Sequence, residues 1–159
     1  GPADLLGRTN HILLKLKERN WRRMMTAQAI SLNCASGEFV IASAGHCYPY
    51  IVGKNGSSAI PIEINGMPLG SASKKPHSEN RGSIAGQETL VLYTDGVVEA
   101  VNAQGEMFGY QRFAALLQSA WADDLEEYWQ NIMSGYNSWA VNQDDDLTFM
   151  MIRFSGEVQ

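Results

Sequence analysis

The chain has 159 residues, of which 45% are hydrophobic and 18% are charged; this is ordinary for one globular domain and excludes a disordered protein. Twelve basic and seventeen acidic residues give a net charge of −5. Residues 1–23 hold six basic and two acidic side chains (+4), which leaves six basic and fifteen acidic (−9) for the other 136. Such an acidic body argues against a nucleic-acid partner, because phosphates attract basic surfaces.

The first half of the chain predicts one helix followed by short strands. In Leu5–Lys17, apolar residues recur at helical spacing with charges between them. Residues 65–86 are rich in Gly, Ser and Pro and show little periodicity, so we expect a loop or an irregular crossing there. Strands are expected at 25–32, 38–44 and 48–52, with turns at 33–37 and 53–56.

The second half predicts two strands that flank two helices. Thr89–Tyr93 is an apolar run typical of a buried strand, and Leu147–Phe154 is the last strand. Helices are expected at 110–121 and 124–141, the second capped by Asp123 or Asp124. Strands outnumber helices and do not alternate with them, so the predicted fold class is α+β, not a doubly wound parallel sheet.

The termini and cysteines carry expectations about the protein's origin and compartment. Gly1-Pro2 is similar to the remnant of a cleaved affinity tag, so we expect the protein's own sequence to span 3–159. Cys34 and Cys47 are too few and too loosely spaced for a zinc site and predict reduced thiols in a cytoplasmic protein. No apolar run approaches the about 20 residues of a membrane-spanning helix, so we expect no membrane contact by this domain.

Two acidic positions lie where predicted strands end or begin. Asp95 follows the buried strand 89–93, and Asp145, within the run Asp144–Asp146, precedes the last strand. Carboxylates from adjacent strands can share a hard divalent cation, whose bound water becomes a nucleophile for phosphoryl or acyl transfer. An Asp-Gly turn at 95–96 and an exposed acidic loop at 144–146 are the alternative interpretations, and spacing alone does not decide between them.

Five segments, in chain order, resemble the motifs of one enzyme family. Leu92–Gly109 is similar to "LYTDGxxEAxNxxGExFG", and Asp145–Thr148 to the closing "DD-[IL]-T". The other three are Met25–Ala27 ("F-x-TA"), Ala42–Pro49 ("NAGHxP") and Gly66–Gly70 ("G-x-PLG"). Together they resemble the PPM-type serine/threonine phosphatases of the protein phosphatase 2C superfamily, and more narrowly the SpoIIE/RsbU branch.

The resemblance implies a layered β-sandwich flanked by helices, with a binuclear Mn²⁺ or Mg²⁺ centre. It implies that Asp95 and Asp145 are metal ligands and the catalytic residues of the site. Asp146 is the neighbouring acid of the metal set, and Asp144 leaves an ambiguity of one residue. In this family a metal-bound water attacks phosphoserine or phosphothreonine directly. The implied partner is a phosphorylated protein of the anti-sigma-factor antagonist type, in bacterial signalling and stress response.

Other residues of these motifs are expected to support the site. We expect His46 to fix a loop through a hydrogen bond and not to act in catalysis. Thr94 and Thr148 are expected to bond backbone near the two aspartates, and Gly96 to allow a tight turn. Glu99 is equally consistent with support of the site and with a solvent-facing acid.

The family has two further acidic elements, "GDxxD" and a "DxSGKG"-like segment, and neither occurs in this sequence. The second of them supplies the aspartate that bridges the two metals. We therefore expect the chain to be the C-terminal two-thirds of a family domain, inactive or nearly so in isolation. The missing N-terminal strands would leave sheet edges open, so a homodimer is also expected. The alternative function is a non-catalytic, phosphatase-like module that binds a protein; a membrane-tethered sensor could precede the domain in the parent.

Overall fold

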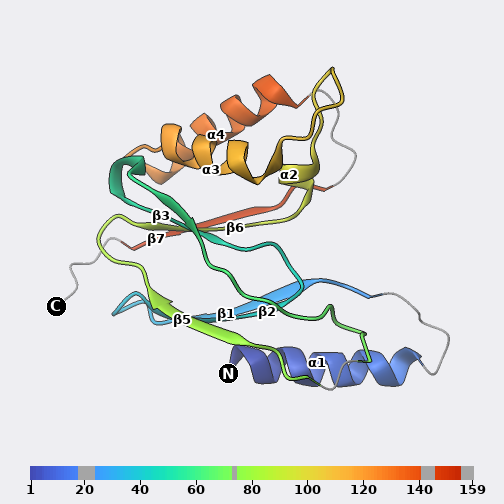
Figure 1. Ribbon diagram of the computed structural model, residues 1–159. Coiled ribbons are helices and arrows are strands. Elements are labelled where there is room, and N and C mark those ends of the chain that lie inside the picture. Colours follow the sequence, from blue (N-terminus) through green and yellow to red (C-terminus); the bar gives the residue numbers. More distant parts are fainter. Residues whose placement is uncertain (18–23, 73–74, 141–145, 155–159) are drawn as a thin grey trace. The chain divides into compact units, whose positions relative to one another are not determined.

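The computed structural model describes residues 1–17, 24–72, 75–140 and 146–154. It is an α+β fold with two antiparallel sheets, and its chain divides into two compact units (Figure 1). Among the described residues, the first unit comprises Gly1–Tyr48 and Glu63–Ser83, and the second comprises Pro49–Ile62 and 84–154. None of the helices in the described part combines the length and apolarity that a bilayer crossing requires.

The first unit is a three-stranded antiparallel sheet that carries one helix on a face. The helix α1 spans Pro2–Lys17, so the helix predicted at 5–17 is confirmed and begins three residues earlier. The strands, in sheet order, are β1 (Ala27–Leu32), β2 (Glu38–Ala44) and β5 (Glu79–Ser83). Leu6 of α1 packs into a buried cluster with Ala42, Ala44 and Leu69. Small alanines on β2 let the helix backbone approach the sheet closely.

The strand β5 corrects the loop predicted over 65–86. Its sequence, Glu-Asn-Arg-Gly-Ser, has no apolar alternation, and four of its five residues are exposed. It pairs with β2 along one side only and is an edge strand of the described sheet. Edge strands are commonly polar, because charged side chains discourage pairing with other chains. The periodicity on which strand prediction depends is therefore missing here.

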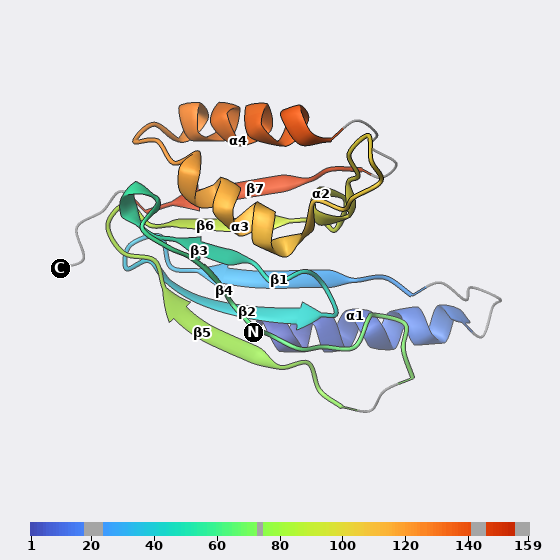
Figure 2. The ribbon, with the colours of Figure 1, turned by 45° about the horizontal axis from the view of Figure 1, so that its top comes forward.

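The second unit is a four-stranded antiparallel sheet with helices along one face (Figure 2). In sheet order its strands are β4 (Ala59–Pro61), β3 (Tyr50–Val52), β6 (Thr89–Tyr93) and β7 (Phe149–Arg153). Its helices are η1 (Lys54–Gly56), α2 (Gly96–Glu99), α3 (Gly109–Ser119) and α4 (Leu125–Trp139). Asp124 caps α4, since its side chain accepts a hydrogen bond from the Glu127 amide at 2.9 Å. This decides between the two caps expected from the sequence.

Aromatic rings fill the core of the second unit. The ring of Phe113, fully buried on α3, lies 5.6 Å from Tyr50, 4.5 Å from Tyr93 and 5.6 Å from Phe149. Offset and edge-to-face arrangements at such separations add about 0.5–1.5 kcal/mol per pair beyond simple burial. The strands β3, β6 and β7 are thus tied to α3 by one ring cluster.

Candidate functional site

The first predicted metal ligand, Asp95, lies just beyond the end of β6. It is the N-cap residue of α2 and is exposed. Its backbone carbonyl accepts hydrogen bonds from the amides of Val98 at 2.9 Å and Glu99 at 3.0 Å. The backbone of Asp95 is therefore fixed by a helical turn, while its carboxylate faces solvent. Gly96 is the first residue of α2 and has a helical backbone conformation. It therefore does not adopt the glycine-specific turn conformation that we expected from the sequence.

Thr94 connects the end of β6 to the chain that leads into β7. The backbone amide of Thr94 donates to the Thr148 carbonyl at 3.1 Å, continuing the β6–β7 ladder. The Thr94 hydroxyl donates to the Asp146 carbonyl at 3.1 Å and accepts from the Thr148 amide at 3.0 Å. Asp95 and Asp146 thus belong to segments that meet at one end of adjacent strands. Asp144 and Asp145 lie outside the described residues.

The helix α4 supports the Asp95 turn from the protein interior. The buried Tyr136 donates its hydroxyl to the Gly96 carbonyl at 3.3 Å. The Tyr136 ring stacks edge-to-face on Phe108, with 5.6 Å between ring centroids. Burial raises the pKa of Tyr136 above its ordinary value, so the hydroxyl remains a donor well into the alkaline range.

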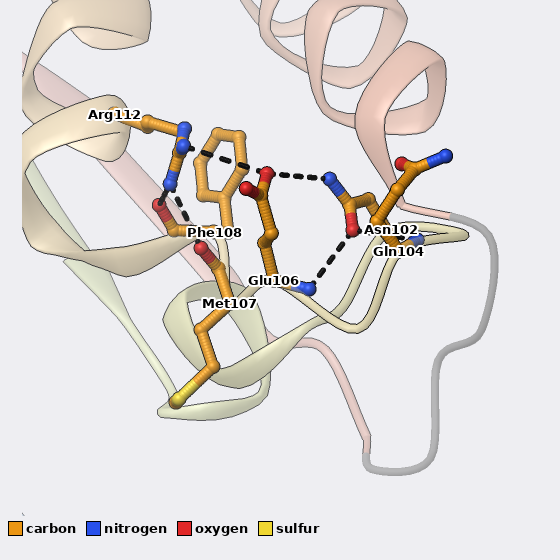
Figure 3. Close-up of polar contacts among 6 residues, drawn as sticks. All are labelled: Asn102, Gln104, Glu106, Met107, Phe108 and Arg112. Atoms are coloured by element: carbon orange, nitrogen blue, oxygen red, sulfur yellow. Dashed lines mark hydrogen bonds and ion pairs between the residues drawn. The ribbon is translucent and has the colours of Figure 1, made fainter.

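A polar cluster fastens the hairpin that follows α2 (Figure 3). The Asn102 side chain accepts from the Gln104 and Glu106 amides and donates to the Glu106 carboxylate at 3.0 Å. Arg112 donates to the Met107 carbonyl at 3.0 Å, and one of its nitrogens lies 3.8 Å from the Glu106 carboxylate. These residues belong to the "NxxGExFG" motif or follow it closely. Their contacts show that this part of the motif builds a stable hairpin.

The motif residues of the first unit form a second tight structure. Gly45 has a φ of +73°, and a Cβ there would lie 3.1 Å from the Pro68 ring. The amide of His46 donates to the Ser43 hydroxyl at 3.2 Å, and its Nδ1 lies 3.0 Å from the Thr26 hydroxyl. These contacts match the loop-fixing role expected for His46. The contact between Thr26 and His46 joins the "F-x-TA" segment to the "A-G-H" segment.

The described acidic residues near the ends of β6 and β7 are of the type that binds a divalent cation, but they are too few to form a complete ligand set. Asp95 and Asp146 are both exposed and offer carboxylate oxygens, the ligands that Mg²⁺ and Mn²⁺ prefer. Across the described residues, no group of three or more His, Cys, Asp or Glu could hold a metal ion. The described part therefore supplies a partial ligand set.

Comparison with protein families gives a match over nearly the whole chain. The family model for Stage II sporulation protein E (SpoIIE) matches residues 1–155. The chain belongs to this family. Its membership confirms the predicted resemblance to the SpoIIE/RsbU branch. A search of curated proteins found no match.

Solved structures with the same fold are phosphatase domains and their relatives. The SiaA-PP2C domain of Pseudomonas aeruginosa has a TM-score of 0.82 and 22% identity, covering 96% of this chain and 61% of its own. The RsbU and RsbW domains of Rv1364c from Mycobacterium tuberculosis give 0.72 and 24%, covering 91% of this chain and 40% of theirs. The SpoIIE phosphatase domain of Bacillus subtilis, presoaked with Mn, gives 0.60 and 9%, covering 84% of this chain and 58% of its own. The predicted protein phosphatase 2C-like α+β fold is confirmed, and the chain spans about three-fifths or less of these structures.

Proposed function

We propose that this chain is the C-terminal two-thirds of a metal-dependent protein serine/threonine phosphatase domain. The observation that carries the proposal is the meeting of the chain at Asp95 and the chain at Asp146 at one end of β6 and β7. Membership of the SpoIIE family supports it, because its relatives include a phosphatase domain presoaked with Mn and RsbX in complex with magnesium.

Asp95, Asp145 and Asp146 are the proposed ligands of a Mn²⁺ or Mg²⁺ ion. A divalent cation bound there would lower the pKa of a coordinated water and supply the nucleophile for phosphoester hydrolysis. The chain's own contribution is to position negative charge: the α2 turn fixes Asp95, and the Thr94 hydroxyl fixes the backbone that follows Asp145. Fixed backbone at Asp95 and at Asp146 is what a preorganised site requires.

The proposed substrate is a protein carrying phosphoserine or phosphothreonine, such as an anti-sigma-factor antagonist. The match to a structure that contains RsbU and RsbW domains supports a partner of this class. The acidic balance of residues 24–159 makes a nucleic-acid substrate unfavourable. A cytoplasmic location is part of the same proposal.

We further propose that the isolated chain has little activity. The "DxSGKG"-like element, which supplies the metal-bridging aspartate in the family, does not occur in this sequence, and the number and charge of the ligands largely set the affinity for a hard cation. The second candidate function is a non-catalytic module that binds a protein through the same surface; the parent's residues at the two missing acidic elements would distinguish it from an enzyme.

The test is Mn²⁺-dependent hydrolysis of a phosphoserine peptide, measured for this chain and for the complete domain of its parent protein. We expect turnover in the complete domain, loss of it in Asp95→Asn, and at most trace turnover in the isolated chain. Asp4→Asn on α1 is the matched control, because it removes an exposed carboxylate remote in sequence from both acidic segments. Absence of metal-dependent turnover in the complete domain would leave the binding module as the function. Full activity of the isolated chain would contradict the proposed truncation.

A further inference from the structure

We propose that β7 forms an interface with the β7 strand of a second copy of this chain. The proposal does not depend on the metal site, and it assigns the homodimer expected from the sequence to one strand. β7 is an outer strand of its sheet: it pairs with β6, and no other described strand pairs with it. In the described part of the chain, its opposite side is therefore open to another strand.

The register of β6 and β7 decides which backbone groups of β7 face the open side. The Thr94 amide donates to the Thr148 carbonyl, so these two opposite residues occupy a hydrogen-bonded position of the ladder. Such positions alternate along an antiparallel pair, which turns the amides and carbonyls of Met150 and Ile152 toward β6 as well. The three other residues of the strand present their amides and carbonyls to the open side: Phe149, Met151 and Arg153.

The side chains of β7 do not protect this edge. Edge strands usually avoid pairing with other chains by carrying charged residues or proline. β4, the other outer strand of the sheet, has three residues and ends in Pro61, which has no amide to donate. β7 has five residues, Phe-Met-Met-Ile-Arg, and its only charged residue, Arg153, lies at one end. Met150 is 55% exposed, which leaves a large apolar side chain in water beside the open edge.

A groove beside the edge provides space for the apolar side chains of an added strand. It has a volume of about 290 Å³ and lies between the start of α4 and β7. Its lining is apolar apart from one acid: Leu125, Glu126, Trp129, Phe149 and Met151. A strand paired with the open side of β7 would place alternate side chains on the face that carries this groove. Methionine suits such a space, because its unbranched and flexible side chain fills irregular gaps.

A second β7 complements this edge in an antiparallel register. With the two-fold axis at Met151, this residue pairs with its own counterpart, and Phe149 pairs with Arg153 of the second copy. All three outward-facing residues of each strand then have hydrogen-bonded partners. Each arginine lies opposite an aromatic side chain, so no like charges face each other across the pair. A parallel, in-register pair would instead bring the two arginines together.

The experiment is analytical ultracentrifugation of the whole 159-residue chain between about 10 and 500 µM, because five paired residues make a small and weak interface. We expect the average mass to rise with concentration from that of one chain toward that of two. Met151→Lys and Met151→Glu should each place like charges directly opposite one another and leave the chain monomeric. An equimolar mixture of these two variants should recover the dimer, because opposite charges then meet at position 151.

The matched control and the register have measurements of their own. Ile60→Lys places the same charge on β4, where Ile60 is 61% exposed, and should leave dimer formation unchanged. Hydrogen exchange should slow with rising concentration at the amides of Phe149, Met151 and Arg153. The amides of Met150 and Ile152 already bond to β6 and should change less.

A natural chain that stays monomeric over this range would overturn the proposal. A dimer that persists in both charged variants, or that is lost in Ile60→Lys, would place the interface elsewhere and overturn it as well. Protection of the outward-facing amides in a monomeric chain would show that another segment of the same chain covers the edge, which also contradicts the proposal. If a charged variant fails to fold, Met151→Pro removes an amide that faces away from β6 and is judged by the same measurement.

Discussion

The two units stabilise their motif segments in different ways. In the first unit, small residues bring backbones together: Ala42 and Ala44 lie under α1, and Gly66 lies against the Ser43 carbonyl. In the second unit, large rings fill the space around Phe113, and hydroxyl groups bond the chain near Asp95. Where backbones are in close contact, an added side-chain atom has no space. Where packed rings fill the core, removing one of them leaves a cavity.

This difference predicts which kind of substitution damages each unit. Added volume should be most harmful in the first unit and removed volume in the second. Loss of a single hydroxyl should have a smaller effect, because the surrounding packing remains.

The largest effect is expected from Phe113→Ala in the second unit. The substitution removes a fully buried ring that contacts three other rings, and truncations of this kind cost about 3–5 kcal/mol. The measurement is the free energy of unfolding in denaturant. Tyr110→Ala on the same helix is the control, because Tyr110 is 55% exposed and its loss should cost well under 1 kcal/mol. Similar losses for both variants would show that the ring cluster is not the basis of stability.

The next effect is expected from Gly66→Ala in the first unit. A Cβ at Gly66 would collide with the Ser43 carbonyl, which belongs to the backbone of β2 and cannot rotate away. Overpacking of this kind typically costs about 1–3 kcal/mol. Gly7→Ala is a control of opposite sign: nothing lies within 4 Å of its Cβ position, and alanine favours a helix by about 0.5–1 kcal/mol. Destabilisation by both variants would mean that α1 is more tightly enclosed than the structure indicates.

The sequence predicted the elements whose pattern of apolar residues matches their burial in the folded chain. The bounds of β2 and β6 agree with the prediction, because alternating or continuous apolar residues mark buried strands. The strand β5 was missed, since a polar edge strand has no apolar pattern. The short helix α2 was taken for a turn, because four residues are too few for helical periodicity to appear.

The candidate site likewise contains residues that the motifs predicted and one contact that they did not. Motif resemblance predicted Asp95, Asp145 and Asp146 as metal ligands, which stays a prediction, and it anticipated hydrogen bonds made by Thr94 and His46. The Tyr136 hydroxyl could not be found in this way, because it lies 40 residues from Gly96 in the chain. Such a bond depends on how α4 packs, which no local pattern of residues encodes.

A smaller effect is expected from Tyr136→Phe, which removes one buried hydroxyl and keeps the ring. The Gly96 carbonyl loses its bond at 3.3 Å, and such a loss typically costs about 1 kcal/mol. The free energy of unfolding measures it, with Tyr110→Phe as the exposed control. The amide signals of residues 95–98 should also shift in NMR, because Gly96 begins the turn that fixes Asp95. A loss of stability without any shift of the amide signals of 95–98 would show that the Tyr136 hydroxyl stabilises the core but does not affect the turn at Asp95.

The same hydroxyl predicts how stability depends on alkaline pH. Burial raises the pKa of Tyr50, Tyr128 and Tyr136 above the ordinary value of 10.0, so the folded chain keeps these protons after the unfolded chain has lost them. Because the unfolded state then binds fewer protons, the contribution of these tyrosines to the free energy of unfolding should be constant below about pH 9 and fall above pH 10. Tyr136→Phe removes one of the three groups and should make this decline shallower. An equal slope in Tyr136→Phe and the natural chain would show that the Tyr136 hydroxyl ionises as freely in the folded state as in the unfolded one.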